Sequence, residues 1–279
     1  MANIGRKNLL EVVKLENHGA YLQAGWLGEI LLPKRYVPED CEIGDPINVF
    51  IYLDSEDRYI ATTQTPKAQV GEVAYLKCIA VNPTGAFFDW GLPKDLLVPF
   101  SEQHKPLKED TNYLVFLYSD EESHRIAGST KLNKYIERNP EGYTQGQAVT
   151  LYINEKTDIG YSAIIDHKDW GVLFYSDVVK PLKIGQKTSG FIKRIRDDGK
   201  IDLSLQAPGF AKIDTLADKI LSLLQKNGGF LALSDKSPPE NIYDQLSVSK
   251  KSYKTAIGTL YKKKLIRIEP EGIHLISAI

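Results

Sequence analysis

The chain has 279 residues, of which 42% are hydrophobic and 25% are charged, and its formal net charge is −1. These values indicate an ordinary globular protein and argue against a strongly basic nucleic-acid-binding protein. No run approaches the ~20 apolar residues that a membrane helix needs. We therefore expect a cytoplasmic protein with no membrane partner.

The small net charge hides an asymmetry between the two halves of the chain. Residues 1–142 carry 15 Lys or Arg against 21 Asp or Glu, whereas residues 143–279 carry 20 against 15. Contacts to phosphates supply most of the sequence-independent affinity of proteins for nucleic acids. A polyanion is therefore expected to prefer the C-terminal half.

Cys41 and Cys78 are the only two cysteines, and neither has a histidine or a second cysteine at ligand spacing. The sequence therefore offers no zinc site and no disulfide framework, and we expect neutral thiols and no cofactor. It also lacks a phosphate loop, a dinucleotide fingerprint, a nucleophile elbow and a His-Glu metal motif, so we expect no enzymatic activity. The one compact acid and base cluster, Asp166-His167-Lys168-Asp169, is expected to be a solvated hairpin turn.

The segment 73–130 has the pattern of a small β-barrel. Strands are expected at 73–81, 85–91, 96–101, 113–119 and 126–130, because these runs are rich in β-branched and aromatic residues. Gly85 supplies the tight bend between the first two strands. Five short strands within about 60 residues are typical of a closed barrel rather than a helical domain.

The same plan occurs twice more, and this repetition is the strongest architectural signal in the chain. Gly19-Ala20-Tyr21 corresponds to Gly85-Ala86-Phe87, and Ile159-Gly160-Tyr161 begins a looser third copy. We therefore predict a mainly β protein with three tandem five-stranded barrels and a small α+β domain at the C-terminus. The predicted domains are 1–66, 67–142 with a linker, 143–212 and 213–279.

The last of these domains has helical periodicity. Apolar residues recur at three and four positions after residue 214, and two shorter amphipathic segments and a β-hairpin follow. This order predicts a winged helix, a variant of the helix-turn-helix class. In its third helix, the residues expected to face the core are Tyr253, Ala256, Ile257, Leu260 and Tyr261.

Two motifs give the chain a resemblance to known proteins. Gly85-Ala86-Phe87-Phe88 with Leu97-Val98-Pro99-Phe100-Ser101 resembles the RNA-binding repeat of the largest small-subunit ribosomal protein, here called the S-one repeat. The order of three such repeats and a winged helix resembles the bacterial YitL/CvfB (conserved virulence factor B) family. The segments that carry this second resemblance are 88–97 and 253–262. It implies three oligonucleotide-binding (OB) barrels that bind single-stranded RNA.

The resemblance also implies which residues bind RNA. The binding face of an S-one repeat carries an aromatic residue two positions after the bend glycine, the residue before that glycine, a third-strand residue and a basic residue that opens the fifth strand. The matching positions are His18, Tyr21, Pro33 and Arg58 in the first barrel, Thr84, Phe87, Pro99 and Arg125 in the second, and Phe174 and Lys200 in the third. Strand alternation points one of Phe87 and Phe88 into the core, and we expect Phe87 to be exposed.

Basic clusters outside this set are candidates for phosphate contacts. One cluster lies beside Lys200 in the third barrel, and the other lies on the last helix. Their members are Lys193, Arg194 and Arg196 in the barrel, and Lys250, Lys251, Lys254 and Lys262 in the helix.

Three functions remain open from the sequence. The first is a non-enzymatic RNA-binding regulator of gene expression, in which several weak modules bind one single strand. The second is a DNA-binding transcription regulator, although the last helix offers only Thr255 and Thr259 among lysines to read bases. The third is a scaffold whose acidic barrels bind a component of the ribosome or of RNA polymerase. The resemblance favours the first.

Overall fold

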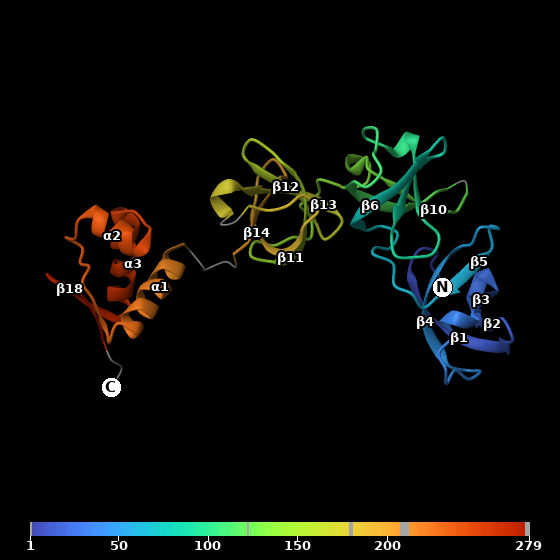
Figure 1. Cartoon of the computed structure of the whole chain (residues 1–279), viewed down its shortest axis with the longest axis horizontal. Helices are drawn as coiled ribbons and strands as arrows, with labels where there is room; N and C mark the ends of the chain where they lie inside the picture. The colour runs from blue at the N-terminus through green and yellow to red at the C-terminus, as the bar shows by residue number, and fades with distance from the viewer. Residues whose placement is uncertain (1, 122, 179–180, 207–211, 277–279) are drawn as a thin grey trace. The chain divides into compact units, whose positions relative to one another are not determined.

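The computed structural model describes residues 2–121, 123–178, 181–206 and 212–276. It divides into two compact units, Met1–Leu205 and Gln206–Ile279. The first unit consists of three five-stranded barrels that follow one another along the chain, and the second contains the three α-helices (Figure 1). The predicted mainly β fold, with three barrels before a winged helix, is therefore confirmed. Among the described residues, no helix is both long and apolar enough to span a membrane.

In each barrel the first strand pairs with the second and the fourth, and the fifth pairs with the fourth; in barrels 1 and 3 the fifth also pairs with the third. The strands of barrel 1 are β1 (Lys7–Glu16), β2 (Gly19–Gln23), β3 (Glu29–Pro33), β4 (Pro46–Leu53) and β5 (Tyr59–Thr62). Those of barrel 2 are β6 (Val73–Asn82), β7 (Gly85–Asp89), β8 (Leu96–Pro99), β9 (Asn112–Ser119) and β10 (Ile126–Ser129). Those of barrel 3 are β11 (Ala148–Lys156), β12 (Gly160–Ile165), β13 (Asp169–Phe174), β14 (Lys187–Ile195) and β15 (Ile201–Ser204).

Barrel 2 differs from the other two in how it closes. The hydrogen-bonded ladder that joins the third and fifth strands in barrels 1 and 3 is not formed between β8 and β10. Side chains fill the space between the two strands instead. The Val98 side chain of β8 lies so close to Gly128 of β10 that a Cβ atom added there would be only 2.9 Å away from it. The two strands therefore remain in contact without a shared ladder.

The barrels form because every second residue of a strand points inward. In β7, Ala86 and Phe88 are buried, whereas Phe87 between them is half-buried. The expected alternation at this pair is therefore correct, with Phe88 in the core. Short 3-10 helices connect the strands, namely η1 (Gly25–Leu27), η2 (Lys34–Tyr36), η3 (Phe100–Glu102), η4 (Leu132–Lys134) and η5 (Tyr175–Asp177).

Barrels 2 and 3 share an apolar cluster, which we call the joint. Its buried members come from both barrels and from the linker between them, and they are Val73, Leu114, Phe116, Leu132, Ile136, Tyr152 and Ile164. Burial of apolar surface of this kind is the dominant favourable term in packing domains together. The joint therefore fixes barrel 3 to barrel 2 through side chains that the sequence shows only as ordinary strand and linker residues.

The turn that contains His167 is part of this joint, so the prediction of a solvated loop was wrong. His167 Nδ1 accepts a hydrogen bond of 2.9 Å from the backbone N–H of Val73, and Nε2 lies 2.9 Å from the Tyr152 hydroxyl. Asp169 is buried and accepts hydrogen bonds from the Asn139 backbone and the Tyr143 hydroxyl. Turn composition alone cannot show this, because the partners come from distant segments of the chain.

The second unit is a winged helix with a three-stranded sheet in the order β16-β18-β17. Its elements are α1 (Lys212–Lys226), β16 (Phe230–Leu231), α2 (Pro239–Leu246), α3 (Lys250–Lys262), β17 (Ile266–Glu269) and β18 (Gly272–Leu275). Four of the five residues expected to face the core in α3 are buried. The fifth, Tyr261, is 58% exposed, because the helix turns this position away from the packed face. The sequence also gave no sign of β16, which has only two residues.

We predict that acid weakens the joint through His167. Burial, partly offset by Glu72 and Asp166 and reinforced by Lys187, lowers the pKa of His167 below its ordinary value of 6.5. The neutral ring is therefore favoured in the folded state, so its stabilisation is complete above about pH 6.5 and is lost as the pH falls through the lowered pKa. Calorimetric melting temperatures of the full chain should consequently drop between pH 7.5 and 5.5.

Two variants make this prediction specific. His167→Phe should flatten the pH dependence of the melting temperature, because the phenyl ring cannot take up a proton. His104→Asn, at an exposed position, should leave the dependence unchanged. An equal pH response in the wild type and in His167→Phe would contradict the role given to His167.

Candidate nucleic-acid interface

In all three barrels, a glycine opens the second strand and fixes which residue points outward. The glycine pairs with the last residue of the third strand, as Gly19 with Pro33, Gly85 with Pro99 and Gly160 with Phe174. A Cβ atom at these glycines would lie 2.1 to 2.5 Å from a carbonyl oxygen of the third strand. The two backbones can approach this closely only at glycine. The residues two positions later, Tyr21, Phe87 and Ser162, are accordingly half-buried on the outer face.

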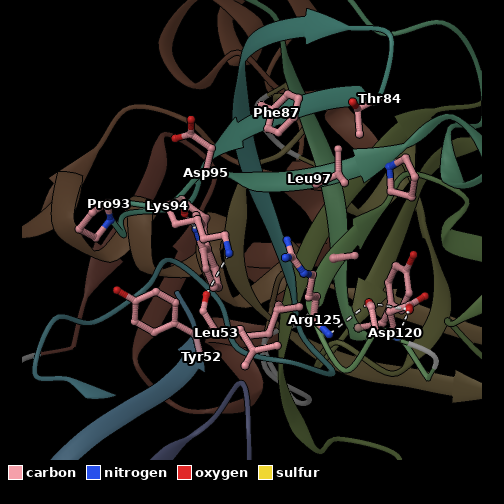
Figure 2. Close-up of a pocket in the computed structure, with 16 residues that line it drawn as sticks. Tyr52, Leu53, Thr84, Phe87, Pro93, Lys94, Asp95, Leu97, Asp120 and Arg125 are labelled. Atoms are coloured by element: carbon pink, nitrogen blue, oxygen red, sulfur yellow. Dashed lines mark hydrogen bonds between the residues drawn. The ribbon is translucent and has the colours of Figure 1, made fainter. Parts of the chain in front are cut away.

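Barrel 2 has a cavity of about 650 Å³ on this face (Figure 2). All four positions predicted for this barrel line it, namely Thr84, Phe87, Pro99 and Arg125. Tyr52 and Leu53, from the end of β4 in barrel 1, line it as well. The structure therefore brings the predicted residues together at one cavity, to which barrel 1 contributes part of the wall.

Two cations, Lys94 and Arg125, and two carboxylates, Asp95 and Asp120, line this cavity. Lys94 Nζ donates to the carbonyl oxygens of Leu53 (3.1 Å) and Asp54 (2.6 Å). Burial, and then the charge of Arg125, lower the pKa of Lys94. Among the described residues no carboxylate forms an ion pair with Lys94, although the charges of Asp57 and Asp54 partly offset the lowering of its pKa. Arg125 forms an ion pair with Asp57 in the β4–β5 turn.

In barrel 1, His18 and Tyr21 form one unit. His18 Nε2 lies 2.9 Å from the Tyr21 hydroxyl, and the two rings meet edge to face at 5.7 Å. Lys14 Nζ lies over the Tyr21 ring, 5.4 Å from its centre, so a cation of the protein already lies against this ring. Arg58 does not take part in these contacts. It forms ion pairs with Asp54 and Glu56 instead.

In barrel 3, each predicted cation except Arg194 already has a carboxylate partner. The pairs are Lys193 with Asp177, Arg196 with Asp202 and Lys200 with Asp198. The Arg196 guanidinium also lies 5.4 Å from the centre of the Phe174 ring. Arg194 is exposed and has no ion pair among the described residues. The basic cluster is therefore less positive than its sequence indicates.

On the last helix, α3, the predicted lysines differ in their surroundings. Lys251, Lys254 and Lys262 are exposed and have no ion pair within the described part of the chain. Lys250 is half-buried, and its Nζ lies 3.5 Å from the carbonyl oxygen of Lys236. The helix itself contains no acidic residue. It therefore presents positive charge that no neighbouring carboxylate reduces.

Some residues on these faces were missed in the sequence. Lys94 lies inside the motif that carried the family resemblance, but nothing in the sequence showed that its side chain would line the cavity. Tyr52 and Tyr118 line the same cavity from strands that otherwise supply the core. Lys14 was missed because it lies before the bend glycine rather than after it. Contacts between strands of different barrels cannot be derived from the pattern of one repeat.

No metal or redox site accompanies these faces in the described residues. No group of three or more His, Cys, Asp or Glu there could hold a metal ion. Cys41 and Cys78 are both free thiols, and burial raises the pKa of each.

Comparison with protein families agrees with the geometry. An S1 domain model, the S-one repeat under its usual name, matches residues 4–64 and 70–131. A model described as a CvfB-like winged helix domain matches residues 218–275. The chain is therefore similar to the conserved virulence factor B family. S1 and winged-helix domains of this kind indicate nucleic-acid binding.

Relatives of the conserved virulence factor B family match along nearly the whole chain. The proteins named Conserved virulence factor B in Staphylococcus aureus (strain bovine RF122 / ET3-1) and Staphylococcus epidermidis (strain ATCC 12228 / FDA PCI 1200) are each 28% identical to it over 284 residues. In both cases the match covers 98% of this chain and 94% of the relative. Among solved structures, the crystal structure of a multidomain protein with nucleic acid binding domains from Streptococcus pneumoniae is similar to this chain. The match covers 98% of each of the two chains, with 23% sequence identity and a TM-score of 0.41.

We predict unequal effects on stability for the two neighbouring phenylalanines of β7. Phe88→Ala should lower the free energy of unfolding of barrel 2 by about 3–5 kcal/mol, because it leaves a cavity in the core. Phe87→Ala should cost no more than about 1 kcal/mol, since the ring is only half-buried. Urea denaturation of both variants measures the difference. Equal destabilisation would mean that the strand register is wrong.

Proposed function

We propose that the chain is a non-enzymatic RNA-binding regulator that binds single-stranded RNA through several modest sites and thereby influences gene expression. The observation that carries the proposal is the cavity of barrel 2, where an aromatic ring and two cations meet. Single-stranded RNA is bound by this combination, because unstacked bases lie on aromatic rings and cations follow the backbone.

The chemistry of the cavity fits one nucleotide of a strand. Phe87 offers a ring face for a base, while Lys94 and Arg125 offer charges for the adjoining phosphate. A volume of about 650 Å³ falls within the range of sites that enclose small ligands, so a base and its sugar can enter. A duplex cannot supply this nucleotide, since its bases are already stacked and paired.

The ion pairs on the binding faces do not oppose this function strongly. Arg58 and Arg125 would each have to leave or share a carboxylate partner when a phosphate binds. Exposed ion pairs contribute only about 0–1 kcal/mol each, so the exchange costs little. The same partners hold the cations in place before RNA arrives. Each site is consequently modest in affinity, and linkage of several sites in one chain raises the effective concentration of the strand at each.

We predict that the chain prefers single-stranded RNA to duplex DNA of equal length. Phe87→Ala should weaken RNA binding by about 1–2 kcal/mol, which is the size of one lost stacking contact. Fluorescence anisotropy at one salt concentration measures both. Tyr75→Ala, which also removes an exposed aromatic ring of barrel 2 but one that does not line the cavity, serves as the control.

The outcomes separate the candidate functions. Equal or tighter binding to duplex DNA would favour a transcription regulator that uses the winged helix. Failure to bind either nucleic acid would favour a scaffold for a ribosome or RNA polymerase component.

We further predict that replacement of Lys250, Lys251 and Lys254 by glutamate reduces the salt dependence of RNA binding. Each phosphate that a cation neutralises contributes about −0.7 to the slope of log affinity against log salt, so the slope should flatten by about two. Glutamate in the first turn suits the helix dipole, so the fold should persist. Titrations at several salt concentrations, with circular dichroism as the folding control, measure this. An unchanged slope would place the phosphate contacts in the barrels alone.

A further inference from the structure

Barrel 3 has lost the aromatic residue that barrels 1 and 2 carry on the outer face. Ser162 occupies the position of Tyr21 and Phe87, and it pairs with Val172 on β13. The next residue pair on the same face of the strands joins Ile164 to Trp170. A base therefore has no ring at position 162 on which to stack, and the face needs a different means of recognition if it contacts the strand.

A cavity of about 370 Å³ lies on this face, and polar side chains line it. Ser162, Asn154 and Trp170 come from the barrel, whereas Asn133 and Arg138 come from the linker after barrel 2. The linker is fixed along β13, because the Glu137 carbonyl accepts a hydrogen bond of 2.9 Å from the Trp170 backbone N–H. The wall that the linker provides is therefore part of the folded structure.

One polar atom in this region has no partner. Trp170 Nε1 is buried, and it is the one buried side-chain nitrogen or oxygen among the described residues without a hydrogen bond. Native proteins leave few such groups unsatisfied, because burial without a partner costs about 1–3 kcal/mol. An acceptor on a ligand that enters the cavity would remove this cost.

Nearby groups complete a set of donors and acceptors. Asn154 Nδ2 donates to Ser162 Oγ at 3.1 Å, which leaves the Asn154 carbonyl oxygen as an acceptor and the Ser162 hydroxyl as a donor. The charges of the cavity nearly cancel, since it is lined by Arg138 and Lys200 and also by Glu155 and Asp198. The hydrogen-bonding groups of this cavity suit the edge of a base.

We propose that this cavity holds one unstacked nucleobase and recognises its edge by hydrogen bonds from Trp170, Asn154 and Ser162. The inference rests on the proposed binding of single-stranded RNA and assigns to barrel 3 the sequence preference of that binding. The volume is sufficient for one nucleobase. Barrels 1 and 2 accept any base, because every base offers a ring face for stacking.

The test compares four homo-oligonucleotides of equal length in fluorescence anisotropy with the full chain. The measured quantity is the ratio between the tightest and the weakest dissociation constant. Trp170→Phe removes the N–H and keeps an aromatic ring, and it should reduce this ratio by about 3- to 10-fold, as expected for one lost hydrogen bond to a base. Asn154→Ala tests a second group of the same set, in case the first variant folds poorly.

Two controls make the result decisive. Trp26→Phe changes a tryptophan that is 64% exposed and whose Nε1 already donates to the Ala2 carbonyl, so the ratio should not change. Phe87→Ala should weaken all four oligonucleotides alike. An unchanged ratio in both Trp170→Phe and Asn154→Ala would overturn the inference and leave water as the partner of Trp170. If the wild type binds no oligonucleotide, the proposed function itself fails.

Discussion

The close approach of two backbones at Gly19, Gly85 and Gly160 is the constraint on which the three candidate binding faces depend. At each glycine the carbonyl oxygen of the third strand occupies the space that a Cβ atom would need. The contact fixes the register of the second strand against the third, and strand alternation then determines which side chain faces outward. The same backbone geometry thus presents Tyr21, Phe87 or Ser162, and only the side chain differs between the barrels.

Much of the fold follows from local sequence patterns, because barrels built from repeats depend on strand alternation and on a few glycines. Gly85 and the Phe87-Phe88 pair were sufficient to predict which ring lies inside barrel 2. The joint could not be predicted in this way, since His167 is bonded to Val73 from a different barrel. Lys94 was missed for the same reason, because its acceptors lie at the end of β4. Patterns within one repeat carry no information about contacts between repeats.

The charges show a related limit of sequence reasoning. Counts of basic residues pointed to Lys193, Arg196 and Lys200 as a positive cluster, yet each has a carboxylate neighbour in the fold. Of the cations predicted to contact phosphates, those without an ion pair among the described residues are Arg194 in barrel 3 and the lysines of α3. On barrel 3 the positive charge is therefore smaller than the count of basic residues indicates. This arrangement favours several modest contacts along a flexible strand over one strong contact with a rigid duplex.

The linker between barrels 2 and 3 connects the stability of the first unit to its chemistry. Leu132 and Ile136 are buried in the joint, whereas Asn133 and Arg138 line the cavity of barrel 3. Both sets belong to one short segment whose backbone is bonded to β13. A change that opens the joint must therefore displace the wall of the cavity as well. For this reason the cavity of barrel 3 is a property of two packed barrels rather than of a single repeat, and the sequence of that repeat gave little indication of it.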